Sequence, residues 1–144
     1  AGDVKRPSDT ARFLNVGMSL VEKHRIGNED RVEAVSLIGD VKDKTALIVD
    51  DELGTGGTVI ATAQALKEHG AKDIYCAVTH PVLSGEASNI LARSEVIETV
   101  VTDTLPVPDA KRGSNLTVLS IAPMLGEAIH RIHSGLSVGA MFEA

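Results

Sequence analysis

The sequence predicts an α/β fold in which helices flank a doubly wound, mostly parallel sheet. The run at residues 45–49 is apolar and β-branched, which is typical of a strand covered on both faces in a parallel sheet. Runs of this kind alternate with segments of helical periodicity, and such alternation indicates βαβ units with right-handed crossovers. With 144 residues, the chain is expected to form a single domain over residues 1–144.

Composition and charge narrow the class of protein. A core of Val, Ile, Leu and Ala is expected, because 43% of the residues are hydrophobic and only 2% are aromatic. The net charge of −6 argues against a nucleic-acid partner. A single cysteine, Cys76, excludes a disulfide framework.

No segment has the pattern of a membrane span or a signal peptide, so we expect a cytoplasmic protein with no membrane partner. The absence of an initiator Met at Ala1 indicates a piece of a longer protein.

The first third of the chain predicts a helix followed by a pair of strands. Ser8 is a candidate N-cap for a helix that runs to about residue 19. A short strand is expected at residues 20–23 and a second at 34–38, paired across the polar segment 24–31.

The remaining elements alternate between strand and helix, except where a Pro-bearing connection at residues 105–108 joins two strands. After the strand at 45–49, helical spacing at residues 59–69 ends at Gly70, which is expected to take the left-handed conformation that follows a helix. The expected order is then strand 73–79, helix 85–92, strand 96–102, strand 116–119 and helix 121–133. Ligands of such sheets bind at the carboxyl ends of the strands.

The segment that follows the strand at 45–49 has the composition of an anion site. Asp50 and Asp51 end the apolar run, and the next seven residues hold glycines at 54, 56 and 57 and hydroxyls at Thr55 and Thr58. A glycine-rich turn into a helix N-terminus offers unpaired N–H groups to a phosphate. No Lys follows the last glycine, as a Walker A loop requires, and the glycine spacing is not that of a dinucleotide fingerprint. Two acids ahead of the loop suit the vicinal hydroxyls of a sugar, so a sugar-phosphate site is predicted.

Several segments resemble a known family. Val49-Asp50-Asp51 with residues 55–58 (TGGT) resembles the phosphoribosyl-diphosphate loop that phosphoribosyltransferases share with ribose-phosphate diphosphokinase. Residues 79–85 (THPVLSG), 100–104 (VVTDT), 4–6 (VKR), 23–25 (KHR) and 137–142 resemble segments of the diphosphokinase alone. The resemblance covers the whole chain, but only the C-terminal half of that two-domain enzyme.

The resemblance implies a type I phosphoribosyltransferase-like fold and a specific reaction. This reaction depends on Mg²⁺ and serves nucleotide biosynthesis. The anomeric hydroxyl of ribose 5-phosphate attacks the β-phosphorus of ATP, giving 5-phosphoribosyl 1-diphosphate and AMP. It also implies a homo-oligomer built from dimers, up to a hexamer. Because the N-terminal half is missing, we expect the isolated chain to bind sugar phosphate weakly and not to turn over.

The resemblance also assigns roles to individual residues. Asp50 and Asp51 would hold the ribose hydroxyls, directly or through Mg²⁺; the alternative for Asp51 is a cap of the following turn, but paired acids at the end of a buried strand are uncommon as mere caps. The 5-phosphate would lie on the rest of the substrate-binding set, namely Gly54, Thr55, Gly56, Gly57 and Thr58. Lys23 and Arg25 would be catalytic residues of a flexible loop that closes over the triphosphate; without the resemblance they read as solvated surface charges.

The chain departs from the family at one position of the loop. The family pattern carries a third acid where this chain has Gly54, and Glu52 is the neighbouring residue that can compensate. Two other functions therefore stay open. One is a phosphoribosyltransferase, for which no segment covering a base is evident, and the other is a non-catalytic regulatory relative of the synthetase.

Overall fold

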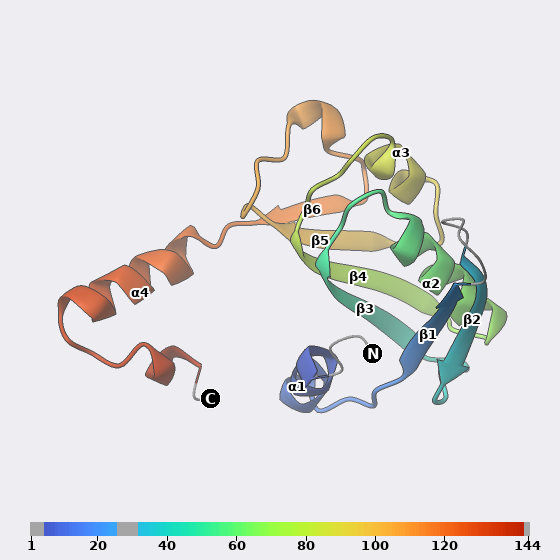
Figure 1. The fold of residues 1–144 in the computed structure, drawn as a ribbon, viewed down its shortest axis with the longest axis horizontal. Coiled ribbons are helices and arrows are strands. Elements are labelled where there is room, and N and C mark those ends of the chain that lie inside the picture. The colour runs from blue at the N-terminus through green and yellow to red at the C-terminus, as the bar shows by residue number, and fades with distance from the viewer. Residues whose placement is uncertain (1–4, 26–31, 143–144) are drawn as a thin grey trace.

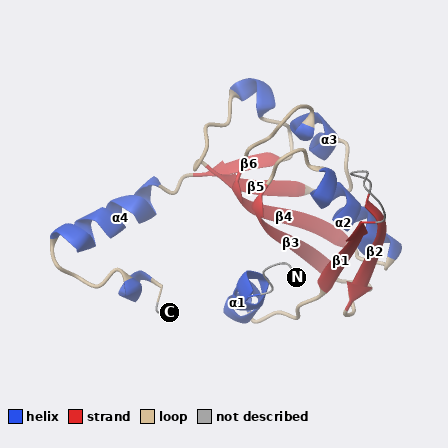
Figure 2. Ribbon diagram, in the orientation of Figure 1, coloured by secondary structure: helices blue, strands red, loops and turns tan. Residues whose placement is uncertain are grey.

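The computed structural model describes the backbone of residues 5–25 and 32–142, and the side chains of residues 8–21 and 37–142. Figures 1 and 2 show a central sheet with helices beside it and one helix directed away from it. The helices are α1 (Lys5–Leu14), α2 (Gly57–Glu68), α3 (Ala87–Ala92) and α4 (Ala122–His133), with short 3₁₀ turns at Asp109–Lys111 and Gly139–Met141. The strands are β1 (Leu20–Arg25), β2 (Val32–Ile38), β3 (Thr45–Glu52), β4 (Asp73–His80), β5 (Glu98–Thr102) and β6 (Leu116–Leu119).

Four parallel strands form the main sheet, in the order β3-β4-β5-β6. The register places Ile48 beside Cys76 and Cys76 beside Thr99. These residues lie on the face that α2 and α3 cover, because Val59 and Ala63 of α2 and Leu91 of α3 belong to the same buried cluster as Ile74 and Cys76. The predicted α/β class, with a parallel sheet and flanking helices, is confirmed.

The opposite face of the sheet is more open. Leu47 of β3 is 47% exposed and Leu119 of β6 is 55% exposed. Strand alternation places both on the face away from α2. The expectation that residues 45–49 are covered on both faces is therefore not met by the part of the chain that the structure describes. The crossovers explain this, since α2 and α3 both pass over the same face.

Strands β1 and β2 form a separate antiparallel pair, as predicted. The pair lies beside α2, and Leu37 packs against the main core. The prediction of a loop from residue 24 was wrong for His24 and Arg25, because both continue β1 through pairing with Ala34 and Val32. The rest of that predicted loop, residues 26–31, lies outside the described residues.

The predicted bounds of two helices needed correction. Helix α1 starts at Lys5, so Ser8 lies inside it rather than at its N-cap, and it ends at Leu14 rather than near residue 19. Asn15 is left-handed, with φ of 52°, which stops the helix. Helix α3 starts at Ala87, since the φ of 56° at Gly85 is incompatible with a right-handed helix. By contrast, Gly70 is left-handed after α2, as predicted.

Helix α4 extends away from the sheet (Figure 1). Its apolar residues Leu125, Ile129 and Ile132 are 48%, 67% and 69% exposed. Their spacing puts them on one side of the helix. This stripe is not covered by the described part of the chain. Across the described residues, no helix combines the length and the apolar character that crossing a membrane requires.

Candidate functional site

The candidate site forms where β3 ends and α2 begins. Strand β3 continues past the apolar run through Asp50, Asp51 and Glu52, and Leu53 then turns into the core, where it is only 1% exposed. Gly56 precedes the first helical residue with φ of 84°. This left-handed conformation costs an L-residue energy, so a glycine is favoured at this point.

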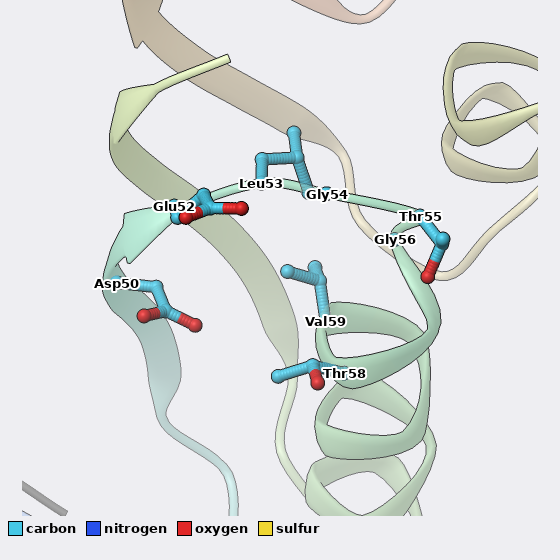
Figure 3. Close-up of a pocket in the computed structure, with 8 residues that line it drawn as sticks. All are labelled: Asp50, Glu52, Leu53, Gly54, Thr55, Gly56, Thr58 and Val59. Atoms are coloured by element: carbon cyan, nitrogen blue, oxygen red, sulfur yellow. The ribbon is translucent and has the colours of Figure 1, made fainter. Parts of the chain in front are cut away.

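A cavity of about 240 Å³ lies against this turn (Figure 3). Five of its lining residues belong to the predicted set, namely Asp50, Gly54, Thr55, Gly56 and Thr58. The lining also includes Glu52, Leu53 and Val59, which were not in that set. The predicted residues Asp51 and Gly57 do not line the cavity. Gly57 is instead the first residue of α2.

The N-terminus of α2 faces this cavity without a side-chain cap. The cap position is Gly56, and no side chain, that of Thr58 included, caps this end of the helix. The first intrahelical bond runs from the N–H of Ile60 to the carbonyl of Gly56, 3.0 Å away. The preceding amides of the first turn therefore have no acceptor within the helix, and with the helix dipole they make a favourable environment for an anion.

The segment at residues 79–85 supports the glycine loop through the backbone. The N–H of Leu53 donates to the carbonyl of His80 at 2.9 Å, and the N–H of Leu83 donates to the carbonyl of Leu53 at 2.9 Å. Leu83 is 1% exposed and left-handed, with φ of 49°. Strained backbone of this kind is held in place by its surroundings and often occurs at functional sites. Residues 79–85 (THPVLSG), which resemble a segment of the diphosphokinase, thus support the loop through hydrogen bonds and do not line the cavity.

The carboxylates divide between the two faces of β3. Asp50 and Glu52 are two residues apart, so both project on the side that faces α2 (Figure 3). Alternation turns Asp51 to the other face, where it is exposed. The N–H of Asp51 also donates to Oδ1 of Asp50 at 2.9 Å, which orients that carboxylate. The signal for Glu52 was present in the sequence, because a strand that continues past Asp50 gives residues 50 and 52 the same face.

Carboxylate oxygens are also suitable ligands for a hard cation. Mg²⁺ is commonly held by one or two carboxylates together with substrate phosphates. Asp50 and Glu52 supply such oxygens at the cavity. Within the described residues, no three His, Cys, Asp or Glu side chains are grouped as a metal site.

Cys76 lies behind the cavity and does not have the character of a nucleophile. It is 1% exposed, and burial, together with the nearby charge of Asp50, raises its pKa to about 12. A thiol with this pKa stays protonated near neutral pH and is unreactive.

His80 ends β4 at the same sheet edge, in register with Glu52. Its Nδ1 lies 3.0 Å from the hydroxyl of Thr104. That hydroxyl also donates to the carbonyl of Thr79 at 2.9 Å. The hydrogen bond to Thr104 gives His80 a structural partner at this edge of the sheet.

Lys23 and Arg25 lie in β1, opposite Val35 and Val32 of β2, with an irregularity in the register between residues 24 and 25. Both belong to a strand rather than to a loop. Their side chains lie outside the described residues, so their catalytic role stays a prediction.

Comparison with known proteins gives a consistent result. The family model described as the phosphoribosyl synthetase-associated domain matches residues 11–143. A ribose-phosphate pyrophosphokinase of Caldanaerobacter subterraneus subsp. tengcongensis is 43% identical over 141 residues, which are 98% of this chain and 44% of that protein. The protein of the same name from Oceanobacillus iheyensis is 40% identical over 142 residues, 99% of this chain and 44% of its own length.

A solved structure shows the same fold. The phosphoribosylpyrophosphate synthetase from Mycobacterium smegmatis superposes with a TM-score of 0.84 at 38% identity, over 94% of this chain and 43% of that one. The chain therefore spans less than half the length of the relatives that it matches.

Proposed function

Because the chain belongs to the phosphoribosyl synthetase-associated domain family, we propose that it forms the sugar-phosphate half of a ribose-phosphate diphosphokinase active site. The observation that carries the proposal is the cavity at the end of β3, where Asp50 lies beside the uncapped N-terminus of α2. Carboxylates on one side and unpaired amides on the other match the two ends of ribose 5-phosphate.

Each end of the substrate has a proposed set of partners. The amides at residues 56–58 and the hydroxyls of Thr55 and Thr58 hold the 5-phosphate. Asp50, which lines the cavity and is held in orientation by the amide of Asp51, accepts hydrogen bonds from the ribose hydroxyls. Asp51, whose side chain lies on the other face of β3, is proposed to reach these hydroxyls from outside the cavity. Fixing both ends directs the anomeric hydroxyl toward the β-phosphorus of ATP, and such positioning supplies most of the rate in phosphoryl transfer.

Mg²⁺, when bound, neutralises charge on the transferring phosphate oxygens. Asp50 and Asp51, as predicted from the sequence, are its proposed contacts on this chain, through the ribose hydroxyls or directly. Lys23 and Arg25 are proposed to stabilise the same charge from the β1 side of the molecule.

The rest of the ATP site is proposed to come from protein beyond this domain. The relatives are more than twice as long as the matched region, which leaves room for a second domain. We place the chain in the C-terminal half of such an enzyme, acting in the cytoplasm in nucleotide biosynthesis.

Assembly into a homo-oligomer is also proposed, on the basis of α4. Three apolar side chains, Leu125, Ile129 and Ile132, are exposed on one side of this helix. A stripe of this kind is usually buried against another protein surface. Light scattering is expected to give a mass that is an even multiple of 15.1 kDa, and Ile129→Ser with Ile132→Ser is expected to lower it. A monomer for the unsubstituted chain would contradict the proposal.

Product analysis tests the function. The chain is mixed with a separately expressed N-terminal half of a relative, ATP, ribose 5-phosphate and Mg²⁺, and AMP release is measured. AMP formation by the mixture, absent with either half alone, is the expected result. Pyrophosphate release from phosphoribosyl diphosphate and a base would instead indicate a phosphoribosyltransferase. Ribose 5-phosphate binding without either reaction would indicate a regulatory relative.

A further inference from the structure

We propose that Glu52 takes the place of the acid that the loop lacks at Gly54, by accepting a hydrogen bond from a sugar hydroxyl of the substrate. The proposal rests on the proposed function, because it assigns a specificity-determining residue within the same sugar-phosphate site.

The position of Glu52 on β3 places it in the cavity. The strand remains regular through this residue, which pairs with His80 of β4. Two residues separate Glu52 from Asp50, so the two side chains share a face, and both line the cavity. Figure 3 shows the two carboxylates on the same side of the strand.

The carboxylate of Glu52 lies next to the space over Gly54. A side chain at position 54 would begin 3.8 Å from Oε1 of Glu52, and no other atom outside the adjoining residues lies within 4 Å of that point. Glu52 thus brings an acidic oxygen to the place from which a residue 54 side chain would extend. The absence of a side chain at Gly54 leaves this space to Glu52.

The carboxylate of Glu52 is also available to a ligand. This carboxylate makes no hydrogen bond or ion pair with any residue that the structure describes, and Glu52 is exposed. An ionised carboxylate only accepts hydrogen bonds, so its partner must carry donors. A sugar hydroxyl is a donor, whereas a phosphate dianion is repelled. Glu52 therefore favours a hydroxyl-bearing sugar phosphate over a bare phosphate at the same loop.

Binding by the whole 144-residue chain tests this assignment. The probes are ribose 5-phosphate and inorganic phosphate, each titrated in EDTA and followed by NMR chemical shifts, which measure weak binding. The change Glu52→Gln is expected to raise the Kd for ribose 5-phosphate by about 10-fold or more, the value of a lost charged hydrogen bond. The Kd for phosphate is expected to stay the same or to fall, because a negative charge has been removed.

A rescue variant distinguishes a ligand contact from a structural effect. Adding Gly54→Asp to Glu52→Gln returns an acid to the loop, and a Cβ at position 54 would meet its nearest neighbour outside the adjoining residues, the side chain of residue 52, at an ordinary contact distance of 3.8 Å. The double variant is expected to recover most of the affinity for ribose 5-phosphate. Glu68→Gln is the matched control, since Glu68 is exposed at the far end of α2, and no change is expected.

The possible outcomes distinguish the proposed function of the chain from the proposed role of Glu52. Failure of the unsubstituted chain to bind ribose 5-phosphate contradicts the proposed function itself. Normal binding that Glu52→Gln leaves intact contradicts only the role of Glu52. A loss that affects both probes equally also contradicts a direct contact with the sugar.

Discussion

The N–H of Ser84 donates a 3.0 Å hydrogen bond to the carbonyl oxygen of Gly54, and this bond joins the loop after β4 to the loop after β3. Together with the two bonds of Leu53, it makes the second loop a scaffold for the first. The amino group of Lys111 reaches the carbonyl of Leu83 at 2.5 Å and ties this scaffold to the segment before β6. The shape of the phosphate site therefore depends on residues that do not line it.

Removing the buried anchor of this scaffold should weaken the fold. Leu83→Ala is expected to lower the free energy of unfolding by about 2–5 kcal/mol, because Leu83 is 1% exposed and its loss leaves a cavity. Urea denaturation measures the effect. Val82→Ala is the control, since Val82 is 40% exposed, and its expected cost is no more than about 1 kcal/mol. Equal costs would show that the segment is not braced at Leu83.

The left-handed glycine before α2 gives a second prediction. Gly56→Ala is expected to cost about 1–2 kcal/mol in unfolding free energy and to weaken phosphate binding, because φ of 84° strains any L-residue. A Cβ there would have its nearest neighbour at 3.8 Å, so the cost is conformational rather than steric.

Gly57→Ala is the matched control for that change. Gly57 is the first residue of α2 and does not have a positive φ, so alanine should leave stability unchanged or raise it by up to about 1 kcal/mol. Thermal or urea unfolding of the two variants provides the comparison. A similar loss in both variants would contradict the special role of Gly56.

The buried thiol makes stability depend on pH in the alkaline range. Burial and the charge of Asp50 raise the pKa of Cys76 from 9.0 to about 12. In the unfolded chain the thiol loses its proton near its ordinary pKa, while the folded chain keeps it. The stabilisation is therefore complete below about pH 9 and is lost as pH rises toward 12. Between pH 8 and 10 the loss is expected to be about 1 kcal/mol.

Two measurements check the thiol prediction. The urea midpoint should fall less steeply with pH in Cys76→Val than in the unsubstituted chain, since the variant lacks the titrating group. At pH 8, a disulfide reagent should label Cys76 slowly until the chain is unfolded. Rapid labelling of the folded chain would contradict the buried, protonated thiol.

The carboxylates of β3 are predicted to act on the sugar and not on the fold. Asp50→Asn and Asp51→Asn should each raise the Kd for ribose 5-phosphate by about 10-fold or more, through loss of a charged acceptor. Asp43→Asn is the control, because Asp43 is exposed before the amino end of β3, away from the cavity, and its φ of 60° suits asparagine. Calorimetry or NMR titration measures the affinities. Unchanged binding in Asp51→Asn alone would restrict the sugar contact to the cavity face of β3.

Most helices and strands could be predicted from the sequence, because apolar runs and helical spacing are local signals. Strand β6 was predicted at its observed bounds, and Gly70 was correctly expected to end α2 in a left-handed conformation. The early end of α1 was not predicted, since nothing in the pattern requires Asn15 to be left-handed. His24 and Arg25 look like loop residues, and only pairing with β2 makes them part of a strand.

The site could be predicted from the sequence only in part, for a related physical reason. The loop glycines and Asp50 stand out as a motif, but the cavity also depends on where β3 stops. A strand that ends at residue 49 makes Asp50 and Asp51 equivalent, whereas the observed strand separates them and brings in Glu52. The backbone bonds from Leu83 and Ser84 connect segments about 30 residues apart, and such contacts leave no periodic signal.

The most direct test of the sugar-phosphate site is an NMR titration of the ¹⁵N-labelled chain with ribose 5-phosphate. Saturable shifts are expected in the amides of Gly56, Gly57 and Thr58. The amide of Asp43, before the amino end of β3, is expected to stay unchanged. Absence of saturation, or saturable shifts that lie away from residues 50–58, would contradict the assignment of this loop as the sugar-phosphate site.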